Sequence, residues 1–182
     1  MGPTIRRAAV ALTAAATMTS LPAGTANAAT YRELTNQKTD WRKCVSLAGG
    51  GSTANNTNLV IYTCTGGDEQ QWAFEPAGDY YRIKNRKAGG GKCVSVGGGG
   101  GTAQGDPVIL YTCNGGREQD WSTVAYGLGY LVVNRKSGYT WSLADGGSTA
   151  NNTHIVQWRI LDSAPEQVWR DPGAAPGRVW VV

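Results

Sequence analysis

The sequence predicts an all-β domain built from three copies of one unit of about 48 residues. The repetition is clearest in the octapeptide GGSTANNT, which occurs at Gly50–Thr57 and again, unchanged, at Gly146–Thr153. Short apolar stretches alternate with Gly- and Asn-rich segments, and no stretch shows a helical stripe. About twelve short strands in a threefold repeat favour a closed barrel or a trefoil over a sandwich.

Three sets of residues mark the same positions in each copy. An aromatic residue follows a serine at a constant distance, and a Gln-x-Trp tripeptide comes next, ending at Trp72, Trp121 and Trp169. The middle copy carries a looser version of the octapeptide, GGGTAQGD. The octapeptide therefore belongs to the repeat, and we interpret it as a turn between strands in which Gly and Asn tolerate positive φ.

Each copy is expected to contain four strands. In the second copy, the alternating, β-branched or aromatic stretches that predict them are Tyr80–Lys84, Lys92–Val96, Val108–Cys113 and Gln119–Val124. The three copies are expected to span residues 31–79, 80–128 and 129–170, followed by a C-terminal tail at 171–182.

Residues 1–28 have the features of a secretory signal peptide. Arg6 and Arg7 precede a short Ala-rich apolar run, and residues 26–28 read Ala-Asn-Ala, which fits a cleavage site. This run is too short to span a membrane, and no later segment is apolar enough to do so. We therefore expect a secreted, extracellular single domain of residues 29–182, and the Ala/Gly/Arg-rich leader indicates a bacterial source.

The charge and the metal-binding residue types exclude several partners. The net charge of +4 falls to +2 when Arg6 and Arg7 leave with the signal peptide, so nucleic acid and anionic membranes are not expected ligands. His154 is the single histidine and no C-x-x-C pair occurs, so we expect no metal site and no cofactor.

The four cysteines predict two disulfides, each within one copy. An even number of cysteines in an exported chain is typical of disulfide bonding. Cys44 and Cys64 have the same spacing as Cys93 and Cys113, which occupy the same positions of the second copy. The third copy lacks both partners together, whereas a bond between copies would leave a free thiol. The predicted pairs are therefore Cys44–Cys64 and Cys93–Cys113.

These features together resemble the ricin-B-type lectin family. The resemblance rests on three in-register Gln-x-Trp tripeptides, strand pairs that end in Tyr-Thr-Cys, and the turn Gly-Gly-Ser-Thr-Ala-Asn, and it covers about residues 31–170. It implies a β-trefoil, which is a threefold barrel with a hairpin cap, and a function in binding galactose, xylan or related sugars.

Each copy then offers a candidate sugar site made of a serine, an aromatic residue and a glutamate. An aromatic face packs against the C–H surface of a sugar, and a carboxylate is a strong acceptor for its hydroxyls. The galactose-binding copies of the family carry an Asp where this chain has the serines, so the glutamates are interpreted as the relocated carboxylates. The nine candidates are Ser46, Tyr62, Glu69, Ser95, Tyr111, Glu118, Ser142, Trp158 and Glu166.

The residues leave two rival hypotheses open. The missing Asp also fits a trefoil that no longer binds sugar and whose loops bind a protein, as an inhibitor or an adhesin. A small hydrolase is the third hypothesis, but the acids recur in step with the repeat, whereas an enzyme needs an asymmetric set of groups. We expect a monomeric binding protein without catalytic activity, and we expect Trp72, Trp121 and Trp169 in its core.

Overall fold

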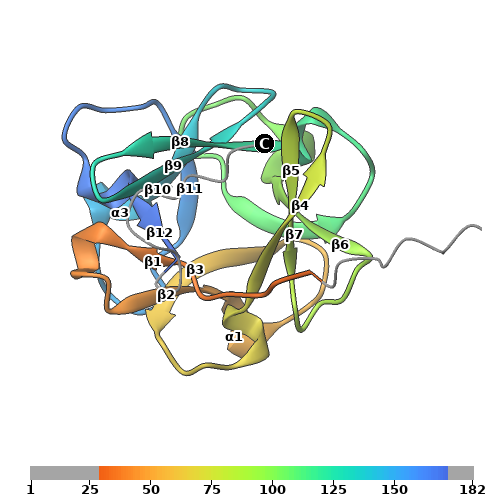
Figure 1. The fold of residues 1–182 in the computed structure, drawn as a ribbon, viewed down its shortest axis with the longest axis horizontal. Helices are drawn as coiled ribbons and strands as arrows, with labels where there is room; N and C mark the ends of the chain where they lie inside the picture. The colour runs from red at the N-terminus through yellow and green to blue at the C-terminus, as the bar shows by residue number, and fades with distance from the viewer. Residues whose placement is uncertain (1–28, 172–182) are drawn as a thin grey trace, which may run out of the picture.

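The structure, a computed structural model, describes residues 29–171. The predicted signal peptide at residues 1–28 and the tail from residue 172 onward lie outside the described residues. Figure 1 shows the three copies following one another around a common centre. Their strands are β1 (Thr35–Asn36), β2 (Lys43–Leu47), β3 (Thr57–Thr63), β4 (Trp72–Ala77), β5 (Tyr80–Asn85), β6 (Lys92–Val96), β7 (Val108–Thr112), β8 (Trp121–Tyr126), β9 (Gly129–Asn134), β10 (Thr140–Leu143), β11 (Ile155–Trp158) and β12 (Trp169–Arg170).

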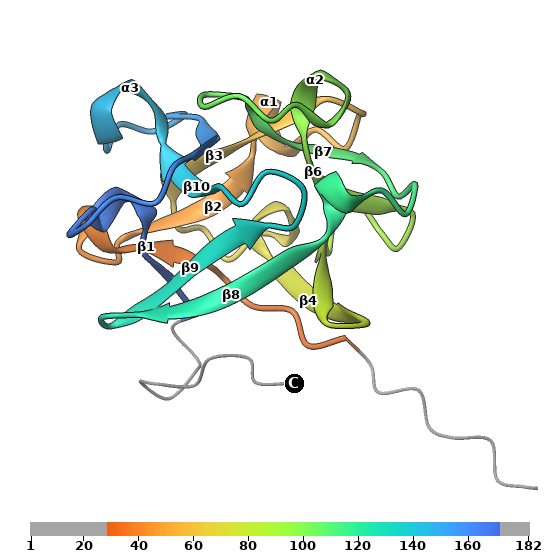
Figure 2. The same cartoon turned by 90° about the horizontal axis from the view of Figure 1, so that it is seen from above.

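Short helical turns connect these strands. Three turns that follow β2, β6 and β10 contain left-handed residues inside them, so they are sharp reversals rather than helices. Figure 2 shows that they lie at one end of the molecule. No described helix is long and apolar enough to cross a membrane. The turns are α1 (Ala48–Gly51), α2 (Gly97–Gly100) and α3 (Ala144–Gly147), with 3-10 turns η1 (Gln37–Thr39), η2 (Asp68–Gln70), η3 (Arg117–Gln119) and η4 (Pro165–Gln167).

Six strands, two from each copy, form a barrel. β4 pairs with β5, β5 with β8, β8 with β9, β9 with β12, and β12 with β1, all antiparallel. Two backbone hydrogen bonds of 2.8 Å between Arg32 and Trp72 link the segment before β1 to β4 and so complete the ring. A closed ring leaves none of these strands with an open edge.

The other six strands form three hairpins that cap the barrel. β2 pairs with β3, β6 with β7, and β10 with β11. The hairpins contact one another through the β3–β7 pairing and through the isolated bridges Val60–His154 and Pro107–Val156. This barrel with its hairpin cap is a β-trefoil, and the predicted fold and the predicted twelve strands are confirmed.

The core is built from the tryptophans of the Gln-x-Trp tripeptides, as predicted. Trp72, Trp121 and Trp169 are at most 1% exposed. Each indole nitrogen donates a hydrogen bond to the strand that begins its own hairpin: Trp72 to the carbonyl of Val45 at 2.9 Å, Trp121 to that of Val94 at 3.0 Å, and Trp169 to that of Trp141 at 3.3 Å. Trp141, which the sequence did not mark, packs edge-on against both Trp121 and Trp169.

The glutamine of each tripeptide holds the loop before it. In the second copy, the Gln119 side-chain nitrogen donates to the carbonyl of Thr112 at 2.9 Å, and its side-chain oxygen accepts from the backbone N–H of Asn114 at 2.9 Å. Gln70 and Gln167 make equivalent bonds. Gln119 lies in η3, from which its side chain bonds to this loop, and β8 begins only at Trp121. The predicted strand start at Gln119 was therefore wrong.

Both predicted disulfides are present. Cys44 is bonded to Cys64 and Cys93 to Cys113, and the described residues hold no free cysteine. Each bond ties the first strand of a hairpin to the segment that follows its second strand. Each bond therefore closes a hairpin near its open end.

The octapeptides are turns, as predicted, but they also join neighbouring copies. The side-chain oxygen of Asn55 accepts a hydrogen bond from the backbone N–H of Thr112 in the second copy, at 3.0 Å. The side-chain oxygen of Asn151 accepts one from the N–H of Thr63 in the first copy, at 3.1 Å. The next asparagine in each turn has a φ of 65° or 67°, a left-handed value that Asn tolerates. The doubled octapeptide is therefore a joint between copies.

Replacing Asn55 by alanine should lower the free energy of unfolding by about 1 kcal/mol, because the substitution removes the acceptor of the Thr112 N–H. Urea denaturation of the variant measures this change. Gln104→Ala is the matched control, because Gln104 takes the same place in the middle copy and its side chain makes no hydrogen bond to the described residues. Equal stability losses for the two variants would show that the hydrogen bond between Asn55 and Thr112 does not stabilise the contact between copies.

Candidate functional site

Two pockets lie where the sequence places candidate sites. The pocket of the third copy has a volume of about 350 Å³, and Ser142, Trp158 and Glu166 all line it. The pocket of the second copy has a volume of about 240 Å³ and is lined by the equivalent trio. That trio consists of Ser95, Tyr111 and Glu118. We call these the third-copy pocket and the second-copy pocket.

The same elements position each trio. The serine lies on the first hairpin strand, the aromatic residue on or at the end of the second, and the glutamate in the following 3-10 turn. In the third copy, Ser142 pairs with Val156, which lies two residues before Trp158. Alternate residues of a strand point to the same face, so Val156 and Trp158 line the pocket together. The strand pairing and the alternation of side chains thus bring the predicted trio of the third copy together in one pocket.

Burial divides the trio into a floor and a wall. Ser46, Ser95 and Ser142 are at most 5% exposed. The aromatic side chains are open to solvent: Tyr62 is 38%, Tyr111 36% and Trp158 37% exposed. An exposed aromatic face beside a buried polar floor can contact a ligand without any rearrangement of the core.

The first copy assembles its trio in the same way. Ser46 lies on β2, Tyr62 on β3 and Glu69 in η2. Glu69 packs so closely on α1 that a Cβ on Gly51 would stand 2.9 Å from the Glu69 Cβ. Gly51 also has a φ of 81°, so this position of the turn requires glycine on both counts.

Three lysines, which the sequence did not mark, hold the turns that border the sites. The ammonium group of each donates to a carbonyl of a site turn in the preceding copy: Lys87 to Gly50 at 3.4 Å, Lys136 to Gly100 at 2.5 Å, and Lys38 to Gly146 at 3.2 Å. Their equal spacing along the chain was a signal that could have revealed them. Each of these turns is therefore held by a lysine of another copy, and the turn of the third copy is held by a lysine of the first.

The three glutamates are held differently. Glu118 accepts a hydrogen bond from the side-chain nitrogen of Asn114 at 3.0 Å, and Glu69 accepts one from the Thr65 hydroxyl at 3.4 Å. In the third copy the preceding loop offers Leu161, which has no side-chain donor, and Glu166 instead forms an ion pair with Lys38 at 3.6 Å.

A second residue, besides Leu161, contributes to this difference. The carboxylates of Glu69 and Glu118 lie over Gly67 and Gly116, where a Cβ would overlap their oxygens. The equivalent residue of the third copy is Ala164, which is 6% exposed. Its Cβ closes that space, so the Glu166 carboxylate turns toward the lysine.

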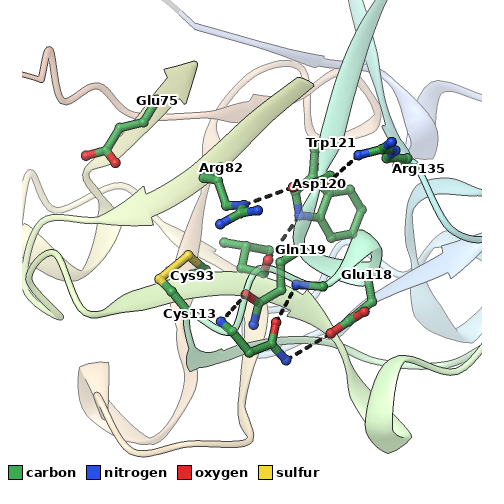
Figure 3. Close-up of polar contacts among 12 residues, drawn as sticks. Glu75, Arg82, Cys93, Cys113, Glu118, Gln119, Asp120, Trp121 and Arg135 are labelled. Carbon is green, nitrogen blue, oxygen red and sulfur yellow. Dashed lines mark hydrogen bonds and ion pairs between the residues drawn. A yellow bond between two sulfur atoms is a disulfide. The ribbon is translucent and has the colours of Figure 1, made fainter. Parts of the chain in front are cut away.

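A buried ion pair beside the second-copy site belongs to the barrel. Asp120 is 3% exposed and lies between Arg82 Nε at 2.9 Å and Arg135 Nη1 at 3.0 Å. Figure 3 shows both arginines near Asp120, with Glu118 pointing away from them. Asp120 therefore links β5 to the segment after β9 and does not line the second-copy pocket.

The remaining titratable and metal-binding groups offer no reactive cluster in the described residues. Burial, with a smaller contribution from the Asp171 carboxylate, raises the pKa of Tyr130 on β9, a core residue. Among residues 29–171, the one cluster of three potential metal ligands is Glu33 with Cys44 and Cys64, whose sulfurs are joined to each other. Neither feature lies in the two pockets.

Comparison with known proteins identifies relatives of this architecture. The family model of the ricin-type β-trefoil lectin domain matches residues 30–169. Among solved structures, the designed threefold symmetric protein ThreeFoil is 30% identical with a TM-score of 0.70, over 77% of this chain and 96% of that one. No match was found among curated proteins.

Two further solved structures are natural proteins. An exo-β-1,3-galactanase from Clostridium thermocellum, 1,3Gal43A, is 27% identical with a TM-score of 0.70, over 84% of this chain. The alignment spans only 31% of that enzyme. The Rhizoctonia solani agglutinin is 20% identical with a TM-score of 0.65, over 82% of this chain and 98% of that one, and it shows the shared fold alone.

Proposed function

Because the chain belongs to the ricin-type β-trefoil lectin domain family, we propose that it is a secreted, non-enzymatic protein that binds poly- or oligosaccharides. Binding takes place at the shallow sites of the copies, up to three in number. The two disulfides support an extracellular location, because such bonds persist in oxidising surroundings.

The observation that carries this proposal is the exposed aromatic side chain above a buried serine, with a carboxylate at the side. Trp158, Ser142 and Glu166 line a pocket of about 350 Å³, within the range of roughly 300–1,000 Å³ that ligand pockets have. An aromatic face offers an apolar surface for sugar C–H groups, and a carboxylate makes hydrogen bonds about twice as strong as neutral acceptors do.

Repetition supports a polymeric ligand. Weak sites on one rigid body gain avidity when a single ligand can reach more than one of them. The turns α1, α2 and α3, which border the sites, lie at the same end of the molecule (Figure 2). A polysaccharide surface offers many sugars to that end at once, whereas a single free monosaccharide does not.

The test is retention on insoluble polysaccharides, combined with a glycan array at high protein density. Trp158→Ala should weaken retention about five- to tenfold, because an aromatic contact contributes roughly 1 kcal/mol. Leu128→Ala is the control, since Leu128 is a 67% exposed side chain on the β8–β9 hairpin, outside both pockets. Failure of the unaltered protein to bind any glycan would reject the proposal in favour of a protein-binding trefoil.

A further inference from the structure

We propose that the third-copy pocket is the strongest carbohydrate site and that the carboxylate of Asp145 is its main hydrogen-bond acceptor. The ligand it fits is a neutral sugar that presents two adjacent hydroxyl groups. This inference rests on the proposed function and deepens it, because it separates one site from the other two.

The turn α3 does not need an aspartate at position 145 in order to form. Asp145 has φ 54° and ψ 47°, a left-handed backbone conformation that residues other than Gly, Asn and Asp rarely adopt. At this position the other two copies have Gly49 and Gly98, which form the same turn with φ values of 62° and 63°. The third copy therefore carries a carboxylate at a place where glycine makes the same turn with less strain.

The Asp145 carboxylate is available to a ligand. It lines the third-copy pocket together with Ser142 and Trp158. Within residues 29–171 it forms no hydrogen bond or ion pair. The nearby ammonium group of Lys38 is directed elsewhere, to the Gly146 carbonyl at 3.2 Å and to Glu166 at 3.6 Å. An exposed carboxylate beside an aromatic face can accept hydrogen bonds from two neighbouring hydroxyls at once.

The second-copy pocket lacks this acceptor. Gly98 provides no side chain there, and Glu118 is already bonded to Asn114. Its volume of about 240 Å³ is also smaller than the third pocket's volume of about 350 Å³. The second site therefore offers Tyr111 and a single carboxylate, one oxygen of which already accepts an internal hydrogen bond.

The charge of the third-copy pocket selects against acidic sugars. Two carboxylates, Asp145 and Glu166, line it, and one lysine pairs with the second of them. The negative charge that remains repels a uronate, whereas the hydroxyls of a neutral sugar can donate to it. A neutral polysaccharide should therefore bind better than its acidic counterpart.

Asp145→Gly tests the inference without endangering the fold, because glycine adopts this backbone conformation readily. We expect at least a tenfold loss of retention on the neutral polysaccharide that the unaltered protein binds, with an unchanged melting temperature. Asp145→Asn should give an intermediate loss, because it keeps an acceptor oxygen and removes the charge. Gly98→Asp should strengthen binding, because space around Gly98 is open and the new carboxylate copies the third site.

The outcomes separate this inference from the proposed function. If the unaltered protein binds arabinogalactan or xylan and Asp145→Gly binds equally well, carbohydrate binding stands and the role of Asp145 is rejected. Stronger binding to polygalacturonate than to every neutral polymer would also overturn the inference. If no polysaccharide is retained at all, the proposed function fails, and the inference fails with it.

Discussion

Replacement of Trp72 by alanine is expected to destabilise the domain by about 3–5 kcal/mol, the usual cost of emptying a buried tryptophan site. Trp72 is 1% exposed, and its indole nitrogen donates to the Val45 carbonyl at 2.9 Å. Its backbone also forms the two hydrogen bonds to Arg32 that complete the barrel. The truncation leaves a cavity next to this closure and removes the donor of a buried carbonyl.

The expected loss is large compared with the whole stability of a domain, which is typically about 5–15 kcal/mol. Chemical denaturation followed by circular dichroism measures it. Trp158→Ala provides the matched control, because Trp158 is 37% exposed and its truncation should weaken binding with little change in stability. If Trp72→Ala lost affinity and kept its stability, Trp72 would belong to the binding site and not to the core.

Removal of the Cys93–Cys113 disulfide is expected to cost about 3 kcal/mol, because the bond restricts a loop whose ends have a sequence separation of 20. A suitable variant carries Thr at 93 and Ile at 113, the residues that the third copy has at Thr140 and Ile160. Thr140 is fully buried and donates to the Val132 carbonyl at 3.1 Å, so this pair is already accepted by the fold.

The readout is the melting temperature, which should fall by roughly 6–12 °C for a domain of this size. Full reduction of the unaltered protein should lower it further, because the Cys44–Cys64 bond is then lost as well. An unchanged melting temperature for the Thr/Ile variant would show that the unfolded chain is not restricted by the bond. In that case the loop-entropy explanation would be wrong.

The features that the sequence predicted are those that repeat along the chain. The tryptophans of the Gln-x-Trp tripeptides recur because each fills the same place in the core. The disulfides could be paired because the third copy lacks both partners at once. Comparing the copies position by position therefore reveals contacts that each copy makes within itself or, as with the disulfides, lacks as a pair.

The features that could not be predicted from the sequence are contacts between copies and the directions of individual side chains. Asn55 bonds to Thr112 of the next copy, and a pattern read within one copy cannot show such a partner. The direction of Glu166 depends on Ala164, whose Cβ excludes the conformation that glycine permits in the other copies. Asp145, which we propose as an acceptor, lies in a turn and differs from the other copies only by comparison with Gly49 and Gly98.

The pairing of β1 with β12 also constrains the order in which the domain can fold. Thr35 is registered with Arg170, 135 residues further along the chain, and Asn36 donates to the Val168 carbonyl at 3.2 Å. Contacts between residues so distant in sequence give a high contact order, which slows folding to about milliseconds to seconds. The barrel thus closes only after β12 has been synthesised, and until then β1 and β9 both lack the strand that pairs with them.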